Sequence, residues 1–250
     1  MGMTLDERIH ALAMRVQTPG KDWTVTGPIW NTIGMWSRYL GFLRIVLGRY
    51  EAANGVWMHF AQRWQKRMRE EAGGASRPLA QDEIEELAAQ HEAGQELHLE
   101  IESFYQFAKI LLDRVADVIL LYFGYPRPKV GSSHSRLVTG QFTRLCEEAL
   151  PLEGRTLKPL MDDLHTRIVR HETDVIEHLN NPKLTPGTSY GAAGRAGISM
   201  GMVAPGPGDD TFPSTEDPAV LFKAIEGYME AVVDFLECNM DKSVLMRTAP

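Results

Sequence analysis

The chain has 250 residues, and its 26 Lys plus Arg against 33 Asp plus Glu give a formal charge of −7 at pH 7. Hydrophobic residues make up 44% and charged residues 24%, which excludes a collagen-like, a fully disordered or a histone-like chain. The two cysteines, Cys146 and Cys238, form neither a disulfide framework nor a Cys-x-x-Cys zinc motif. With no secretory signal and no uncharged apolar run of bilayer length, we expect a cytoplasmic protein without a membrane partner.

The pattern of apolar residues predicts helices almost throughout, because no convincing period-two alternation of β-branched residues is present. Glycines and prolines separate the helical stretches, and Asp217 before Pro218 is a typical helix start. We therefore expect an all-α, up-down bundle of about six helices in a single domain spanning residues 1–250. The expected helices are Leu5–Val16, Pro28–Glu71, Gln81–Phe123, Ser132–Ala149, Arg155–Asn180 and Pro218–Met246.

Residues 182–217 differ from the rest in composition, since they contain seven glycines and five prolines and almost no apolar periodicity. A long segment of this kind is either a flexible loop or a functional one. Gly191, Gly194 and Gly197 around Arg195 leave an anion-binding lid as the alternative to a flexible loop, although they match no phosphate-binding motif.

The second predicted helix carries a heptad-like apolar seam that predicts a packed bundle core, with a ligand groove as the alternative. Its members are Ile33, Trp36, Leu40, Leu43, Leu47, Tyr50, Asn54, Trp57, Ala61, Trp64 and Met68. Glycines recur every seven residues beside the seam, at Gly34, Gly41, Gly48 and Gly55. Each costs a helix about 1 kcal/mol relative to alanine. We therefore expect another backbone to approach this second face closely.

The end of this helix is basic and aromatic, with Arg63, Trp64, Lys66 and Arg67 in close sequence. Positive charge beside an aromatic ring is the combination that an RNA contact requires. Acidic residues follow at 82–86, however, so an intramolecular charge pair or a solvated face is the alternative.

The predicted helix Arg155–Asn180 holds the best candidates for chemistry. On a helical wheel His171 falls within the apolar stripe, and Arg167, Asp174 and His178 lie along its edge. Imidazoles suit proton transfer at neutral pH, and arginine can stabilise a phosphate. A structural seam is an alternative, as is a metal site at His171, Asp174 and His178. Because two helical turns separate the histidines, we expect no metal and no other cofactor.

The stretch Arg170–Asn180, with His171 and His178 in it, resembles the Arg- and His-bearing helix of the HEPN superfamily. Residues Phe104–Arg114 and Ser132–Ser135 resemble further segments of such bundles, so that the resemblance covers roughly residues 95–180. It implies an all-α fold, frequently a homodimer, and for many members metal-independent ribonuclease activity in toxin–antitoxin and other defence systems.

Carried over residue by residue, the resemblance matches His178 to the family histidine, Arg170 to its arginine and His171 to the polar residue that follows that arginine. Together with the helical wheel, this makes His178 the expected acid–base group, assisted by His171, with Arg167 or Arg170 on the phosphate and Asp174 beside them. Seven residues separate Arg170 from His178, where active members have four to six. Two hypotheses follow. The protein is either a ribonuclease or toxin-type effector acting on RNA, or a non-catalytic HEPN-like module that dimerises or binds a protein or nucleotide partner.

Overall fold

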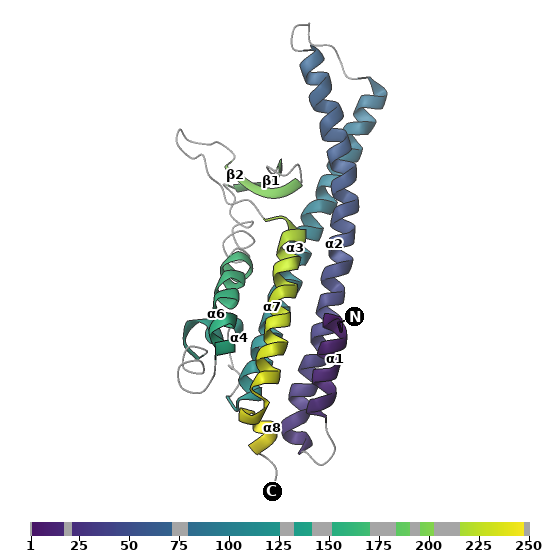
Figure 1. The fold of residues 1–250 in the computed structure, drawn as a ribbon. Coiled ribbons are helices and arrows are strands. Elements are labelled where there is room, and N and C mark those ends of the chain that lie inside the picture. Colours follow the sequence, from purple (N-terminus) through teal and green to yellow (C-terminus); the bar gives the residue numbers. More distant parts are fainter. Residues whose placement is uncertain are drawn as a thin grey trace. The chain divides into compact units, whose positions relative to one another are not determined.

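The computed structural model describes residues 2–17, 22–71, 80–125, 133–141, 152–170, 184–190, 196–202 and 216–247. It confirms the predicted all-α class as a helical bundle, to which one two-stranded hairpin is added (Figure 1). The helices are α1 (Leu5–Val16), α2 (Trp23–Glu71), α3 (Gln81–Tyr122), α4 (Ser133–Arg136), α6 (Leu152–Leu164), α7 (Pro218–Cys238) and α8 (Val244–Arg247). The π-helical turns are η1 (Leu137–Gln141) and η2 (His165–Arg170), η5 (Met240–Lys242) is a 3-10 turn, and the strands are β1 (Leu184–Tyr190) and β2 (Ala196–Met202).

Two helix starts follow from local capping chemistry. At α1, Thr4 and Glu7 form a capping box in which each side chain accepts a hydrogen bond from the backbone N–H of the other. At α7, the Asp217 carboxylate accepts from the backbone N–H of Ala219 at 2.8 Å, as expected for a cap before Pro218. Both helices therefore begin at the predicted residues.

The predicted start of α2 at Pro28 is wrong, because the helix begins at Trp23. Asp22 accepts a hydrogen bond from the backbone N–H of Thr24 at 2.9 Å and so satisfies a free donor at the helix start. Proline is common at first helical positions, but here Pro28 lies inside the helix.

Within the described residues, the helices after α3 include π-helical turns that the sequence did not predict. In place of Ser132–Ala149 the structure has α4 followed by η1, and in place of Arg155–Asn180 it has α6 followed by η2; the remaining residues of both predictions lie outside the described ranges. Likewise α7 ends at Cys238, where Asn239 turns its side-chain amide back onto the carbonyl of Phe235 at 2.8 Å. Apolar periodicity does not distinguish an α-helical from a π-helical turn, so the sequence could not predict these breaks.

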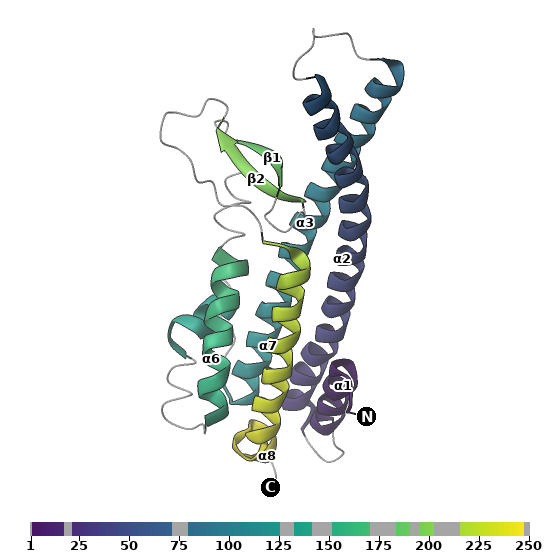
Figure 2. The same ribbon diagram turned by 45° about the horizontal axis from the view of Figure 1, so that its top comes forward.

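The contacts divide the chain into two compact units. Unit 1 comprises residues 1–43, 105–172 and 220–250, and unit 2 comprises residues 44–104 and 173–219, so α2 and α3 contribute a segment to each. In unit 1, α7 runs beside α3 (Figures 1 and 2), and the Tyr122 hydroxyl donates to the carbonyl of Leu236 at 2.9 Å. Arg8 of α1 pairs with Asp234 and Glu237 of α7, which joins a third helix to this core.

In unit 2, α2 and α3 lie antiparallel, as their ion pairs demonstrate. Arg49 pairs with Glu100 and Arg63 with Glu86, so the partners run in opposite order along the two helices. The core that these two helices contribute to unit 2 consists of Val46, Tyr50, Ala53, Ala61, Ala93, Leu97, Ile101 and Phe104, all buried.

The Gly/Pro-rich segment holds a hairpin where the sequence predicts only a loop. Strands β1 and β2 pair antiparallel, with Leu184 opposite Met202 and Tyr190 opposite Ala196. The sequence of both strands alternates larger residues with glycine, serine or threonine. This period-two alternation is typical of a strand, but the glycines and the proline in the same residues are typical of a loop, so the sequence favoured a loop. The glycine–arginine motif of the lid hypothesis falls mostly outside the described residues.

The heptad seam of α2 is confirmed as core, whereas the interpretation of its glycines is wrong within the described chain. Ile33, Trp36, Leu40, Leu43 and Tyr50 are fully buried, and later seam residues such as Trp57 and Trp64 are half-buried. A Cβ atom added at any of the four heptad glycines would meet nothing within 4 Å. No backbone of this chain therefore approaches that face of α2 within the described ranges.

Candidate functional site

The residues that the sequence assigns to chemistry are only partly placed. His171, Asp174 and His178 lie outside the described residues, and Arg170 ends η2 with its side chain also outside them. The Arg167 guanidinium donates to the carboxylate of Asp163, one turn earlier, at 2.8 Å. The assignment of these five residues to catalysis therefore stays a prediction. Arg167 is the only one of them whose side chain is described, and it is hydrogen-bonded to Asp163.

The basic cluster at the end of α2 is paired with acids of α3. Arg63 lies 2.7 Å from the carboxylate of Glu86, and Arg67 pairs with Glu83. Both side chains of the second pair are largely buried, with 16% and 15% of their surface exposed. The Arg67 guanidinium also lies over the Trp64 ring, 5.1 Å from its centre, while Lys66 is exposed. This is the intramolecular pairing that the acidic residues 82–86 indicated, and the proposed RNA contact stays a prediction.

A buried polar centre, absent from the sequence interpretation, lies in unit 1. His134 of α4 is fully buried and stacks on His165 of η2, with ring centres 5.5 Å apart and planes at 29°. The Tyr228 ring of α7 meets His134 edge-on at 6.3 Å. Among the described residues, the two ring nitrogens of His134 and the hydroxyl of Tyr228 have no hydrogen-bond partner. Such unsatisfied buried groups are uncommon in folded proteins.

Two aspartates of α3 fix the start of α4 and thereby position His134. The carboxylate of Asp113 accepts from the backbone N–H of His134 at 2.9 Å, and that of Asp117 accepts from the Ser133 hydroxyl at 2.6 Å. Arg114 pairs with Asp117 at 3.1 Å and offsets part of its buried charge. The imidazole is thus held in the core by backbone and side-chain bonds that do not involve the ring.

Burial sets the protonation state of this centre. Desolvation, and secondly the charge of His165, lower the pKa of His134 to about 3, while burial raises the pKa of Tyr228. His134 is therefore neutral at physiological pH and a poor general acid. We therefore expect the stability of the fold to fall in acid, because a proton on the His134 ring would place a buried charge between α4, η2 and α7.

Nothing in the sequence identifies this centre, because its three rings come from segments up to 94 residues apart and meet only by tertiary packing. The one available signal is the short Ser132–Ser135 segment, in which a single histidine follows two serines.

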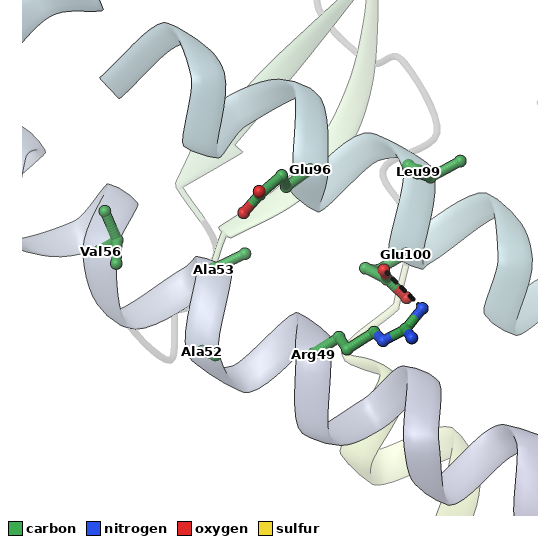
Figure 3. A pocket seen from close by; sticks show the side chains of 7 residues that line it. All are labelled: Arg49, Ala52, Ala53, Val56, Glu96, Leu99 and Glu100. Atoms are coloured by element: carbon green, nitrogen blue, oxygen red, sulfur yellow. Dashed lines mark ion pairs between the residues drawn. The ribbon is translucent and has the colours of Figure 1, made fainter. Parts of the chain in front are cut away.

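Unit 2 has a surface groove between α2 and α3, with a cavity of about 410 Å³ (Figure 3). Four of its lining residues are apolar and the other three are charged, Arg49, Glu96 and Glu100. Arg49 reaches across to Glu100, with 3.9 Å between the guanidinium nitrogen and the carboxylate oxygen. Lining residues from α2 are Arg49, Ala52, Ala53 and Val56, and those from α3 are Glu96, Leu99 and Glu100.

Neither a metal centre nor a membrane span emerges from the part of the chain that the structure describes. There, no three His, Cys, Asp or Glu side chains gather closely enough to hold an ion. No helix within the same ranges has an apolar stretch long enough to cross a bilayer. Comparison with known protein families, curated proteins and solved structures finds no match to this chain.

Proposed function

We propose that this protein is a non-catalytic helical module, of the HEPN-like kind that its sequence resembles, and that it acts by binding a macromolecular partner. The observation that carries this proposal is the pairing of its basic cluster with α3. Arg67 and Glu83 are largely buried together, and Arg63 is paired with Glu86. For Arg67 to bind a phosphate, Glu83 would be left as a buried carboxylate without this partner, which is strongly unfavourable.

Two further observations support binding over ribonuclease chemistry. Arg167, one of the two arginines that the ribonuclease hypothesis would place on the phosphate, donates a hydrogen bond to Asp163. The formal charge of −7 also opposes the approach of a polyanion, since affinity for nucleic acid comes largely from neutralised phosphates. The groove of unit 2 offers a surface for a partner instead.

The test is RNA binding, measured by the fluorescence anisotropy of a labelled single-stranded RNA at several salt concentrations. The wild-type protein should give no salt-dependent binding. A double variant, Glu83→Gln with Glu86→Gln, releases Arg67 and Arg63 and should gain weak binding, whose salt dependence rises by about one phosphate contact per released arginine.

Glu92→Gln is the matched control, because Glu92 is an exposed glutamate of α3 away from both pairs. It changes the net charge by one without releasing either arginine and should leave binding absent. Tight, steeply salt-dependent binding by the wild-type protein would contradict the proposal and favour the ribonuclease hypothesis.

A further inference from the structure

Unit 1 has an outer layer that consists of α4, η1, α6 and η2, which we call the α4–α6 layer. Its elements contact one another, since α4 meets η1 and η2, and α6 meets the same two turns. Figures 1 and 2 show α6 beside α7, on the side of α7 away from α1. The buried apolar residues of the layer are Leu137, Leu157, Met161, Leu164, Ile168 and Val169. The layer is therefore packed through an apolar face.

The backbone of this layer is irregular beside both of its described histidines. His165 is the first residue of η2, and His134 lies three residues before the start of η1. Turns of π-helix are rare, occur mostly singly and are frequent at functional sites. Two such turns beside two histidines indicate a functional role for the layer.

His134 lies where the layer meets α3 and α7. Its fully buried ring stacks on His165 with ring centres 5.5 Å apart, and it meets the ring of Tyr228 edge-on at 6.3 Å. Neither of its ring nitrogens has a hydrogen-bond partner among the described residues. A neutral imidazole is tolerated at such a site. An imidazolium would bury two N–H donors without acceptors, with a second imidazole beside its charge.

The acids near His134 hold its backbone and not its ring. In the described ranges, the charged or titratable residues that contact Ser133 or His134 are Asp113 and Asp117 of α3, His165 of η2 and Tyr228 of α7. Asp113 accepts from the backbone N–H of His134, and Asp117 accepts from the Ser133 hydroxyl and from Arg114. Protonation of the ring therefore disfavours the contact of the layer with α3 and α7.

We propose that the α4–α6 layer is an acid-sensitive switch, which opens from α3 and α7 when His134 takes up a proton while the rest of unit 1 stays folded. In the open layer this imidazole meets water and binds a proton below about pH 6.5. In the closed layer burial, and secondly the charge of His165, hold the pKa of His134 at about 3. The closed state is thus fully favoured above pH 6.5 and loses this advantage progressively as the pH falls toward 3.

The contacts already described between α1, α3 and α7 contain no histidine. The Tyr122 hydroxyl donates to the carbonyl of Leu236 at 2.9 Å, and Arg8 joins α1 to Asp234 and Glu237 of α7. Arginine and carboxylate side chains ordinarily keep their charges down to pH 5. Mild acid therefore acts on the layer before it acts on the packing of these three helices.

Hydrogen exchange at pH 7.5 and pH 5.0, followed by mass spectrometry of peptic peptides, tests the switch. Each exchange rate is divided by the intrinsic rate at the same pH, so that it reports opening alone. Opening of the layer, read from residues 157–169, should increase about 30-fold at pH 5.0, because one imidazole with a pKa of 6.5 binds protons only when exposed. Peptides from α7 and from residues 105–122 of α3 should change by less than about threefold.

Variants on α4 separate the proton from the packing. His134→Leu removes the titrating ring and should abolish the increase, while His10→Leu, at an exposed histidine of α1, should retain it. Ser133→Ala keeps the imidazole but loses the hydroxyl that bonds to Asp117. It should open the layer about fivefold more at both pH values and leave the ratio between them at about 30. Circular dichroism at each pH confirms that the variants are folded.

Three outcomes would overturn the inference: no increase in the opening of the wild-type layer at pH 5.0, an equal increase in α7 and the layer, or an undiminished increase in folded His134→Leu. The first two are read from the wild-type protein alone, so the test stays decisive if a variant fails to fold. No measurement involves RNA or a partner. The proposed function fails separately, if the wild-type protein binds or cleaves RNA.

Discussion

Acidification from pH 7.5 to pH 5 should lower the free energy of unfolding by about 2 kcal/mol through His134 alone. The folded state holds this imidazole neutral, with a pKa of about 3, because desolvation and the charge of His165 oppose its protonation. In the unfolded chain the pKa returns to about 6.5, so the unfolded state binds more protons below that pH. Stability is therefore fully present above pH 6.5 and is lost progressively down to about pH 3.

The measurement is urea unfolding followed by circular dichroism at several pH values between 7.5 and 5, for the wild-type protein and His134→Leu. Leucine at position 134 should remove this part of the pH dependence and also raise stability at pH 7.5, since a buried unsatisfied polar group costs roughly 1–3 kcal/mol. His10→Leu, at an exposed histidine of α1, is the control and should keep the wild-type dependence. Equal pH dependence in wild type and His134→Leu would show that His134 is not held neutral in the core.

Replacement of Trp36 by alanine should lower the free energy of unfolding by about 3 kcal/mol. Removing a fully buried tryptophan typically costs about 3–5 kcal/mol, through lost burial and the cavity left behind. We expect the lower end of that range, because the indole N–H of Trp36 has no hydrogen-bond partner among the described residues. Its removal therefore relieves an unsatisfied donor and offsets part of the loss.

Trp23→Ala is the matched control, on the same helix but with Trp23 53% exposed. Its ring packs on Trp30, with centres 5.9 Å apart, so we expect a cost below about 1 kcal/mol. Urea unfolding of both variants at neutral pH compares them. Equal losses in the two variants would contradict the assignment of the α2 seam to the core.

The sequence predicted the elements whose signals are local. Helix α1 begins at the predicted residue because Thr4 and Glu7 cap it through residues three positions apart. Five of the six seam residues from Ile33 to Tyr50 are buried as predicted and Leu47 is half-buried, since a heptad pattern sustained over several turns specifies one helix face. Asp217 likewise caps α7 through a contact two residues away.

The features that the sequence did not predict depend on tertiary packing or on unusual backbone geometry. The π-helical turns have the same apolar pattern as an α-helix. In the hairpin, larger residues alternate with small ones, but the glycines in both strands are typical of a loop. The stack of His134 on His165 and the groove charges Arg49 and Glu96 each unite residues from different helices. Their proximity is a consequence of tertiary structure that the local patterns of a single sequence do not specify.

The buried His134 centre and the groove differ in their exposure to solvent. Any proton that reaches His134 must enter a fully buried site between α4 and α7, whereas Leu99, Arg49 and Glu96 already lie on the surface of unit 2. The groove is therefore the better candidate for recognition, and the histidine centre is a determinant of stability.

The central claim, that the protein acts by binding and not by cleaving RNA, is tested most directly by an RNA cleavage assay. Purified protein is incubated with total RNA and with transfer RNA in EDTA, beside the His178→Ala variant. The proposal predicts intact RNA with both proteins, while circular dichroism shows that each of them is folded. Cleavage by the wild-type protein that persists in EDTA and disappears in His178→Ala would contradict the proposal and establish a metal-independent ribonuclease.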